Sequence, residues 1–322
     1  MIRSLALLTI AAVGLTAAEP LKMGYSDYIS FTAWEVAKAK GWFKEAGVDV
    51  DLVWFEYGPS IDAFQAGKID AVNVASSDQL VMAGAGKKAS KSIIITDYSN
   101  GNDKIIGKPG LKKTADLKGK KIGVEKGFVD HLLLLKALEA AGLKESDVEI
   151  VNMVTTDTPQ GLASGSVDAV ACWQPNANAT LAQVPGSKAV ASSADFPGLI
   201  YDVVAVSDES LAKRRDDWVK VAKVWDKVVA YTLDPATQAE AVKYMADKAG
   251  VDAEKYAKFL PGSKLHTLKE NVPVLALDGK GLTTLVGSLA VSDAFNREMK
   301  VYEATLKPAD FVDGSVVADA LK

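Results

Sequence analysis

The same order of segments occurs twice before residue 171 of this 322-residue chain. Each copy has the pattern of strand, helix, strand and helix, and both first helices end in Ala-Gly, where glycine accepts the left-handed backbone that ends a helix. The matching segments are residues 22–25 and 121–124, 33–46 and 131–141, 48–53 and 148–151, and 66–72 and 164–170. Alternating strands and helices form largely parallel sheets. The duplication predicts an α/β fold of two lobes, and two unrelated β-α-β-α units, the alternative, predict the same architecture.

The chain is expected to pass between the two lobes twice. The last third has too few strand-like segments for a domain of its own, so we expect it to pack on the first lobe. This gives one lobe from residues 19–104 plus 204–322 and another from 105–203, with crossings near 104–107 and 201–204. Two crossings form a hinge, and the cleft at the hinge is where a ligand would bind.

One helix of the last third is predicted in detail. Ser207 begins an amphipathic stretch that continues to about Leu233, and a serine at this position is a favoured helix N-cap. Its apolar residues fall on one face, which predicts that this face is buried. They are Leu211, Trp218, Val221, Trp225 and Val228.

Residues 1–18 have the pattern of a secretory signal peptide. Arg3 precedes a mostly apolar run over residues 4–15, and small residues at 16–18 offer a cleavage site before Glu19. The run is shorter than the roughly 20 residues of a membrane-spanning helix, which argues against the alternative of a membrane anchor. We expect a periplasmic protein that is not inserted in the membrane.

The residue inventory excludes several classes of protein. The formal net charge is −4 and the pI is about 5.4, whereas a general nucleic-acid binder has a basic face. The single cysteine, Cys172, permits no disulfide within the chain and no cysteine-based zinc site. The two histidines, His131 and His266, are far apart in sequence. We therefore expect no metal, no cofactor and no catalytic residues.

Several phrases of the sequence resemble one family of transport proteins. Residues 39–48 (AKGWFKEAGV), residues 64–70 (FQAGKID) and the turn at 173–175 (WQP) resemble periplasmic substrate-binding proteins of ABC importers, in the branch of nitrate, taurine and alkanesulfonate binders. The resemblance covers roughly residues 20–260. It implies a type II-like periplasmic-binding-protein fold, closure over a small-molecule ligand, and transient contact with the transmembrane subunits of an ABC permease. We expect a monomer with no nucleic-acid partner.

A narrower resemblance concerns the ligand. Residues 24–27, 54–57, 97–103 and 127–131 look like the group of these proteins that is associated with urea carboxylase. That group is linked to import of urea-like compounds or guanidine. The resemblance therefore implies a small nitrogen-rich cation or a urea-like compound, with guanidinium favoured.

The loops expected at the cleft are acidic. In such folds the ligand meets loops at the carboxyl ends of strands, and the loops chosen on this basis are residues 25–31, 54–60, 75–79, 97–103, 125–131, 172–177 and 195–202. Their charged residues are the single lysine Lys126 and the acids Asp27, Glu56, Asp78, Asp97, Asp103, Glu125, Asp130, Asp195 and Asp202. Carboxylates and aromatic faces suit a small organic cation and would repel nitrate or a sulfonate. The alternative is that half of these acids cap helices or lie in solvated turns, and Asp130 is expected to cap the helix that it begins.

Eleven residues are predicted to bind the ligand. They are Asp27, Tyr28, Trp54, Glu56, Ser77, Asp78, Asp97, Phe128, Trp173, Gln174 and Asp202. The acids would accept N–H bonds from the edge of the cation, and the Trp and Phe rings would cover its faces. Gln174 or Ser77 would donate to the carbonyl of a urea. Strand alternation puts Trp54 and Glu56 on one side of their strand, and we expect that side to face the cleft.

Other functions stay open on the same fold. A binder of a small anion such as a sulfonate or nitrate is the alternative ligand class. An enzyme resembling the thiamine-pyrimidine synthases is a second alternative, although that synthase relies on histidine and a cysteine-rich motif, both scarce here. A sensory domain that feeds a signalling receptor is a third, because one ligand-binding fold serves both import and sensing.

Overall fold

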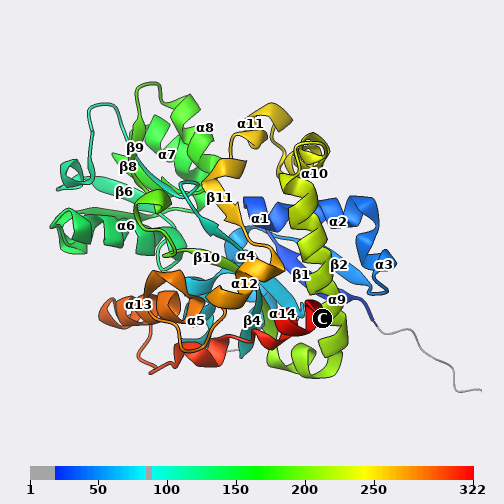
Figure 1. Ribbon diagram of the computed structural model, residues 1–322. Coiled ribbons are helices and arrows are strands. Elements are labelled where there is room, and N and C mark those ends of the chain that lie inside the picture. Colours follow the sequence, from blue (N-terminus) through cyan, green and yellow to red (C-terminus); the bar gives the residue numbers. More distant parts are fainter. Residues whose placement is uncertain (1–18, 85–88) are drawn as a thin grey trace, which may run out of the picture.

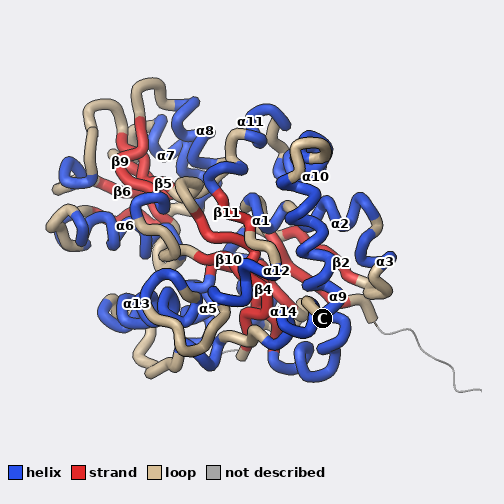
Figure 2. The backbone as a smooth tube through the Cα atoms, viewed as in Figure 1, coloured by secondary structure: helices blue, strands red, loops and turns tan. Residues whose placement is uncertain are grey.

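A computed structural model describes residues 19–84 and 89–322. The predicted signal peptide lies outside the described residues and stays a prediction. Two separate groups of strands, with helices around each, make up the described chain (Figure 2). None of the helices in the described ranges has the length and apolar character that a membrane crossing needs.

The larger sheet combines parallel and antiparallel strands in the order β11-β4-β10-β3-β1-β2. Its strands are β1 (Leu21–Tyr25), β2 (Val50–Trp54), β3 (Ala71–Ala75), β4 (Ser90–Ser99), β10 (Tyr201–Ser207) and β11 (Ser263–Leu265). β1 pairs in parallel with β2 and β3, whereas β10 pairs antiparallel with both β3 and β4. The carboxyl ends of β1, β2 and β3 therefore lie at one edge of this sheet.

The smaller sheet repeats this arrangement in the order β7-β6-β8-β5-β9. Its strands are β5 (Lys104–Gly107), β6 (Lys121–Val124), β7 (Glu149–Asn152), β8 (Ala169–Cys172) and β9 (Lys188–Ser192). β6 pairs in parallel with β7 and β8, and β5 pairs antiparallel with β8 and β9. In both sheets a parallel trio is extended by antiparallel strands, so the predicted two-lobed α/β architecture is confirmed.

The two connections between the sheets lie side by side. Gly101 N donates to Ser193 Oγ over 2.7 Å, and Ser193 N donates to the carbonyl of Asp103 over 3.0 Å. Lys104 already belongs to β5, and β10 begins at Tyr201 and pairs with β4 along its whole length. The crossings are therefore residues 100–103 and 193–200, and the predicted boundary after residue 203 falls inside a strand of the larger sheet.

Helices cover both sheets (Figure 1). Those before the first crossing are α1 (Ile29–Thr32), α2 (Trp34–Lys40), α3 (Trp42–Glu45), α4 (Tyr57–Gln65) and α5 (Ser76–Gly84). The helices beside the smaller sheet are α6 (Val129–Ala140), α7 (Thr158–Ala163) and α8 (Asn176–Gln183). The C-terminal helices are α9 (Asp208–Leu233), α10 (Gln238–Ala249), α11 (Ala253–Ala257), α12 (Leu268–Val274), α13 (Leu285–Glu298) and α14 (Ser315–Ala320). Figure 1 places α9, α10, α12 and α14 around the larger sheet.

The predicted C-terminal helix is confirmed as α9. The side chain of Ser207 accepts a hydrogen bond from Ser210 N over 3.2 Å, which caps the helix as expected. All five residues of the predicted apolar face are buried.

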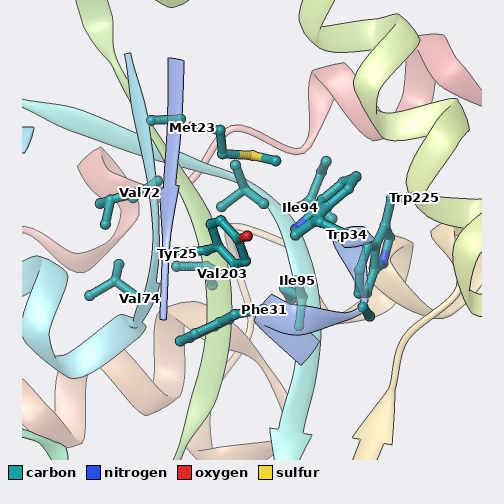
Figure 3. Packing of buried hydrophobic residues seen from close by; sticks show 14 of the residues in the cluster. Met23, Tyr25, Phe31, Trp34, Val72, Val74, Ile94, Ile95, Val203 and Trp225 are labelled. Carbon is teal, nitrogen blue, oxygen red and sulfur yellow. The ribbon is translucent and has the colours of Figure 1, made fainter. Parts of the chain in front are cut away.

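An aromatic core fixes α2 and α9 against the larger sheet (Figure 3). The rings of Trp34 and Trp225 lie 4.8 Å apart between centroids, and both side chains are fully buried. Trp34 Nε1 donates to Asn73 Oδ1, and Asn73 Nδ2 donates to the carbonyl of Gly24, both over 2.9 Å. Because Asn73 lies on β3 and Gly24 on β1, this buried network holds the carboxyl ends of the parallel strands at a fixed position.

Candidate functional site

A cavity of about 180 Å³ lies between the two lobes, at the carboxyl ends of parallel strands from both sheets. We call it the outer cavity. It is lined by Asp27, Glu56, Tyr57, Gly58, Pro59, Glu125, Val154, Thr155, Thr156, Trp173 and Asn176. Residues that follow β1 and β2 thus face residues that follow β6, β7 and β8, which is the place where α/β sheets bind ligands.

A much smaller cavity of about 10 Å³ adjoins it. We call it the inner cavity. It is lined by Tyr28, Phe31, Tyr57, Ala75, Asp103, Val129, Trp173, Ile200 and Asp202. Tyr57 and Trp173 line both cavities, so their side chains separate the two. A volume of this size holds about one water molecule.

Direct contacts across the cleft hold the lobes together. The carboxylate of Asp27 accepts hydrogen bonds from Trp173 Nε1 and from Asn176 Nδ2, each over 3.2 Å. The ring of Tyr57 makes edge contacts with Trp173 at 5.1 Å and with Phe128 at 5.9 Å between centroids. Asp27 and Tyr57 belong to one lobe and their partners to the other, so the structure is a closed form of the cleft.

The outer cavity is acidic. Asp27, Glu56 and Glu125 line it, and none of its lining residues is a Lys or Arg. Burial raises the pKa of Asp27 to about 6, against the opposing hydrogen bond from Trp173. Burial also raises the pKa of Glu125, which accepts a hydrogen bond from Thr155 Oγ1 over 3.2 Å. The lining of the cavity therefore offers a ligand carboxyl groups and no Lys or Arg side chain.

Five buried aspartates lie in or behind the walls of the inner cavity, and two of them, Asp103 and Asp202, line it; we call the five the aspartate cluster. They are Asp78, Asp97, Asp103, Asp130 and Asp202. Asp97 on β4 and Asp202 on β10 are register partners, so their side chains lie on the same face of the sheet. Burial raises the pKa of Asp130 well above its usual range, and the nearby charge of Asp103 raises it further.

The cluster is incompletely hydrogen-bonded. Neither carboxylate oxygen of Asp97 or of Asp130 has a hydrogen-bond partner among the described residues. Asp78 is better provided for, since it accepts from Tyr57 Oη over 2.6 Å and from Val129 N over 3.4 Å. Burial raises the pKa of Asp97 to about 6 and that of Asp78 to about 7. These groups therefore take up protons more readily than ordinary carboxylates.

A family model described as NMT1/THI5 like matches residues 29–241 of the chain. The chain belongs to this family. A protein of Brucella abortus that is named as a binding protein is 30% identical over 270 residues, which cover 81% of this NMT1/THI5-like chain and 83% of the relative. The taurine-binding periplasmic protein of Escherichia coli is 29% identical over 165 residues, which cover 51% of this chain and 48% of the relative.

Solved structures share the fold of this NMT1/THI5-like chain. The periplasmic aliphatic sulphonate binding protein of Escherichia coli superposes with a TM-score of 0.76 at 20% identity, over 94% of this chain and 100% of that one. The periplasmic nitrate-binding protein of Synechocystis gives 0.76 at 12% identity, over 94% and 88% of the two chains. A desulfurization enzyme also superposes, with a TM-score of 0.64 at 15% identity over 94% and 99%. The same fold thus carries binding proteins and an enzyme.

The two cavities bring together some of the residues that the sequence of this NMT1/THI5-like chain predicts to bind the ligand. Asp27, Glu56 and Trp173 line the outer cavity, and Tyr28, Trp173 and Asp202 line the inner one. Four more lie behind these walls without lining either cavity; they are Ser77, Asp78, Asp97 and Phe128. Ser77 Oγ donates to Asp78 Oδ1 over 3.3 Å, so its hydroxyl is engaged within the wall.

Two predicted ligand contacts do not lie at the cavities. The ring of Trp54 packs against Tyr25 and is covered by Lys248 Nζ at 4.5 Å, on the side of α10. Glu56 lines the outer cavity although Trp54 does not. β2 ends at Trp54, so the alternation of side chains along a strand no longer applies at Glu56. The Gln174 side chain instead bonds both the backbone and the side chain of Asn178 over 3.0 Å.

The expected cap at the start of α6 is also wrong. Phe128 occupies the N-cap position, and Asp130 lies inside the helix with both carboxylate oxygens unpartnered within the described chain. Asp130 is therefore a buried member of the aspartate cluster and does not cap the helix.

Sequence reasoning missed several lining residues. Thr155 and Thr156 follow β7, and the rule that selected the other loops would have selected this one as well. Asn176 stood within a selected loop but was not chosen. Tyr57 begins α4 and lines both cavities, whereas strand alternation places it on the side opposite to Glu56.

Proposed function

We propose that this NMT1/THI5-like chain is the periplasmic solute-binding receptor of an ABC importer, and that it captures a small nitrogen-rich cation, with guanidinium favoured. The negative charge of the cleft is the observation that supports a cationic ligand. Asp27, Glu56 and Glu125 line the outer cavity, and no cationic side chain is among its lining residues. The resemblance of the cleft loops to the urea-carboxylase-associated group supports the same choice.

The chemistry of guanidinium fits such a cleft. Its edge presents N–H donors and no acceptor, so a carboxylate-lined site satisfies it with charge-assisted hydrogen bonds. Its flat faces attract aromatic rings, and those of Tyr57 and Trp173 are available between the lobes. Neutral urea carries a carbonyl acceptor and no charge, so it gains less from the same carboxylates.

Capture would proceed by closure of the hinge. The open lobes admit the ligand, and the Asp27 carboxylate then reaches Trp173 and Asn176 across the cleft, as it does in the closed form. The closed receptor would be the form that the transmembrane subunits of the permease recognise. An enzymatic role has less support, because Cys172 is buried and burial raises the pKa of its thiol to about 12.

A small anion is the second candidate ligand. Its support comes from the names of the relatives, which are given as taurine-binding, aliphatic sulphonate binding and nitrate-binding proteins. The hydroxyls of Thr155 and Thr156 at the outer cavity are donors that such an anion would use. The three lining carboxylates oppose it, since an anion would have to approach them unscreened in the closed cleft.

Calorimetric titration of the mature chain with guanidinium, urea, taurine and nitrate separates the candidates, with sodium chloride as the ionic-strength control. We expect binding of guanidinium, weaker binding of urea and none of taurine or nitrate. Binding of taurine or nitrate without guanidinium would refute the cation and favour the second candidate. Replacing Asp27→Asn or Glu56→Gln should weaken guanidinium far more than urea, and equal losses would mean that these acids only shape the loops.

A further inference from the structure

The aspartate cluster is an unusual interior for a stable protein. Buried carboxylates are ordinarily paired with a cation or fully hydrogen-bonded, because removing a charge from water is costly. Asp97 and Asp130 are completely buried, and none of their four carboxylate oxygens makes a hydrogen bond of full geometry within the described residues, although Asp97 lies near Asp202, Ser263 and Ser30, and Asp130 lies near Asp103. These unpartnered oxygens lie beside the cavity-lining Asp202 and Asp103, respectively. The closed cleft therefore has acceptor capacity that the protein itself does not use.

The inner cavity has walls that suit a compact organic cation. Asp103 reaches it from the first hinge crossing and Asp202 from the start of β10, and the rings of Phe31, Tyr57 and Trp173 supply aromatic surface. A hard metal ion would need a shell of oxygen ligands. Within the described chain no group of three or more His, Cys, Asp and Glu residues is arranged to hold a metal.

Other ionisable groups around the cluster leave it acidic. Lys104 is a nearby cation, but its Nζ donates to the carbonyl of Gly101, and burial lowers its pKa. Its charge favours ionisation of Asp103. The remaining neighbours are acids or neutral donors; they are Glu125, Tyr28, Tyr57 and Cys172. The Tyr28 ring lies among Asp97, Asp103 and Asp202, and its hydroxyl accepts from Ser263 Oγ over 3.0 Å.

We propose that the inner cavity receives the charged nitrogen of the ligand, as a compact N–H-donating cation of the ammonium or guanidinium type held between Asp103 and Asp202. The outer cavity is then its entrance. This inference rests on the proposed function and narrows it to one seat. An ammonium group is about the size of the single water molecule that a cavity of about 10 Å³ would hold. Guanidinium is larger, so Tyr57 and Trp173 would have to move apart to admit it. Opening of the lobes about the two crossings allows this movement.

Binding at this seat is coupled to proton release. A neutral carboxylic acid of the cluster gives its O–H proton to solvent as the cation arrives, and the resulting carboxylate accepts the N–H bond. One proton leaves and one cation enters, so the charge inside the cavity is conserved. At pH 7.5 Asp27 of the outer cavity is already ionised, because its pKa is about 6. Glu125 of the outer cavity also has a raised pKa, so proton release that is lost in Asp202→Asn is the signal that reports on the inner seat.

The test compares inner and outer carboxylates in the full mature chain. Guanidinium chloride, methylguanidinium chloride and ammonium chloride are titrated calorimetrically into the wild type, Asp202→Asn, Asp103→Asn and Glu56→Gln, with the exposed Asp216→Asn as the matched control. We expect Asp202→Asn and Asp103→Asn to weaken guanidinium by tenfold to a hundredfold, as for a lost hydrogen bond to a charged group. Glu56→Gln should weaken guanidinium less than the two inner variants do, and Asp216→Asn should change it by less than about threefold. Circular dichroism checks that each variant is folded.

Four results would overturn the proposal in distinguishable ways. If Glu56→Gln loses binding while the inner variants keep it, the cation sits in the outer cavity and the proposed function survives. If no cation binds the wild type, the proposed function fails as well. A second measurement needs no variant: titration at pH 7.5 in buffers of different ionisation enthalpy should reveal proton release on binding, and its absence would exclude the inner seat. Equal affinity for methylguanidinium would also exclude a seat as small as the inner cavity.

Discussion

Replacing Asp97 by asparagine should stabilise the ligand-free protein at neutral pH. Asp97 is fully buried, faces Asp202 across the β4–β10 ladder, and has two unpartnered carboxylate oxygens within the described residues. Burial raises its pKa to about 6 from the 3.8 of a free aspartate. At about 1.4 kcal/mol for each pH unit, the folded state loses roughly 3 kcal/mol through this group at neutral pH. An asparagine removes that loss, and its amide can donate to Asp202.

The net gain is smaller than this, because a buried amide carries a cost of its own. Allowing about 1–2 kcal/mol for imperfect hydrogen bonding, we expect Asp97→Asn to gain about 1–2 kcal/mol. For a chain of this length, that gain corresponds to a rise of roughly 2–3 °C in the melting temperature. The sign depends on pH: a group whose pKa is raised by folding costs nothing below about pH 4, and its cost grows as the pH rises to about 6.

Thermal melts of ligand-free wild type, Asp97→Asn and the exposed control Asp216→Asn, at pH 4 and pH 7.5, measure this difference. At pH 4 the amide cost is not offset, so Asp97→Asn should melt slightly below the wild type, whereas at pH 7.5 it should melt above it; Asp216→Asn should match the wild type at both pH values. A variant that melts below the wild type by the same amount at both pH values would refute the reasoning, since it would show that the carboxyl group makes stabilising contacts irrespective of its charge.

Three further predictions concern the cleft and the core. Guanidinium should raise the melting temperature more at pH 8 than at pH 5, because carboxyl groups such as Asp78, with a pKa of about 7, are neutral at the lower pH; an equal rise at both would contradict this in a thermal-shift assay. Tyr57→Phe removes the hydroxyl that donates to Asp78 over 2.6 Å and should cost about 1–3 kcal/mol in urea unfolding. Tyr98→Phe is the matched control, and similar losses in the two would count against the Asp78 bond. Asn73→Ala leaves the indole N–H of the buried Trp34 without its acceptor and should cost about 2–4 kcal/mol in the same assay, whereas a loss below about 1 kcal/mol would mean that the network does not hold the strands.

Much of the fold follows from local patterns in the sequence. The repeated strand and helix segments predict two sheets with parallel trios, and the apolar face with its serine cap predicts α9 to within a residue. The crossings were displaced by a few residues, because the start of β10 is fixed by pairing with β4 more than a hundred residues earlier. The register between β4 and β10 joins segments far apart in the chain, so no local sequence pattern predicts it.

The candidate site was harder to predict for the same reason. The acidic loops were identified, but the sequence could not show which acids are buried together. Asp97, Asp130 and Asp202 meet only because the hinge crossings and the antiparallel ladder bring distant segments to one place. Alternation also failed at Trp54, since a period of two does not say which side of a strand faces a cleft, and the strand ends there.

The aspartate cluster offers a way to separate cation from anion without knowing the ligand. A carboxyl group near its pKa loses a proton when a cation arrives, whereas an anion can enter only if the same groups become neutral and take protons up. At pH 7 the Asp78 group, with a pKa of about 7, is partly protonated, so a charged ligand bound nearby would shift its protonation in the direction set by the sign of the ligand's charge. If binding of a ligand from a natural extract releases protons, the ligand is a cation. If binding takes protons up, the ligand is an anion such as those in the names of the relatives. The sign of this exchange therefore distinguishes the two ligand classes even where the affinities of the probes are weak.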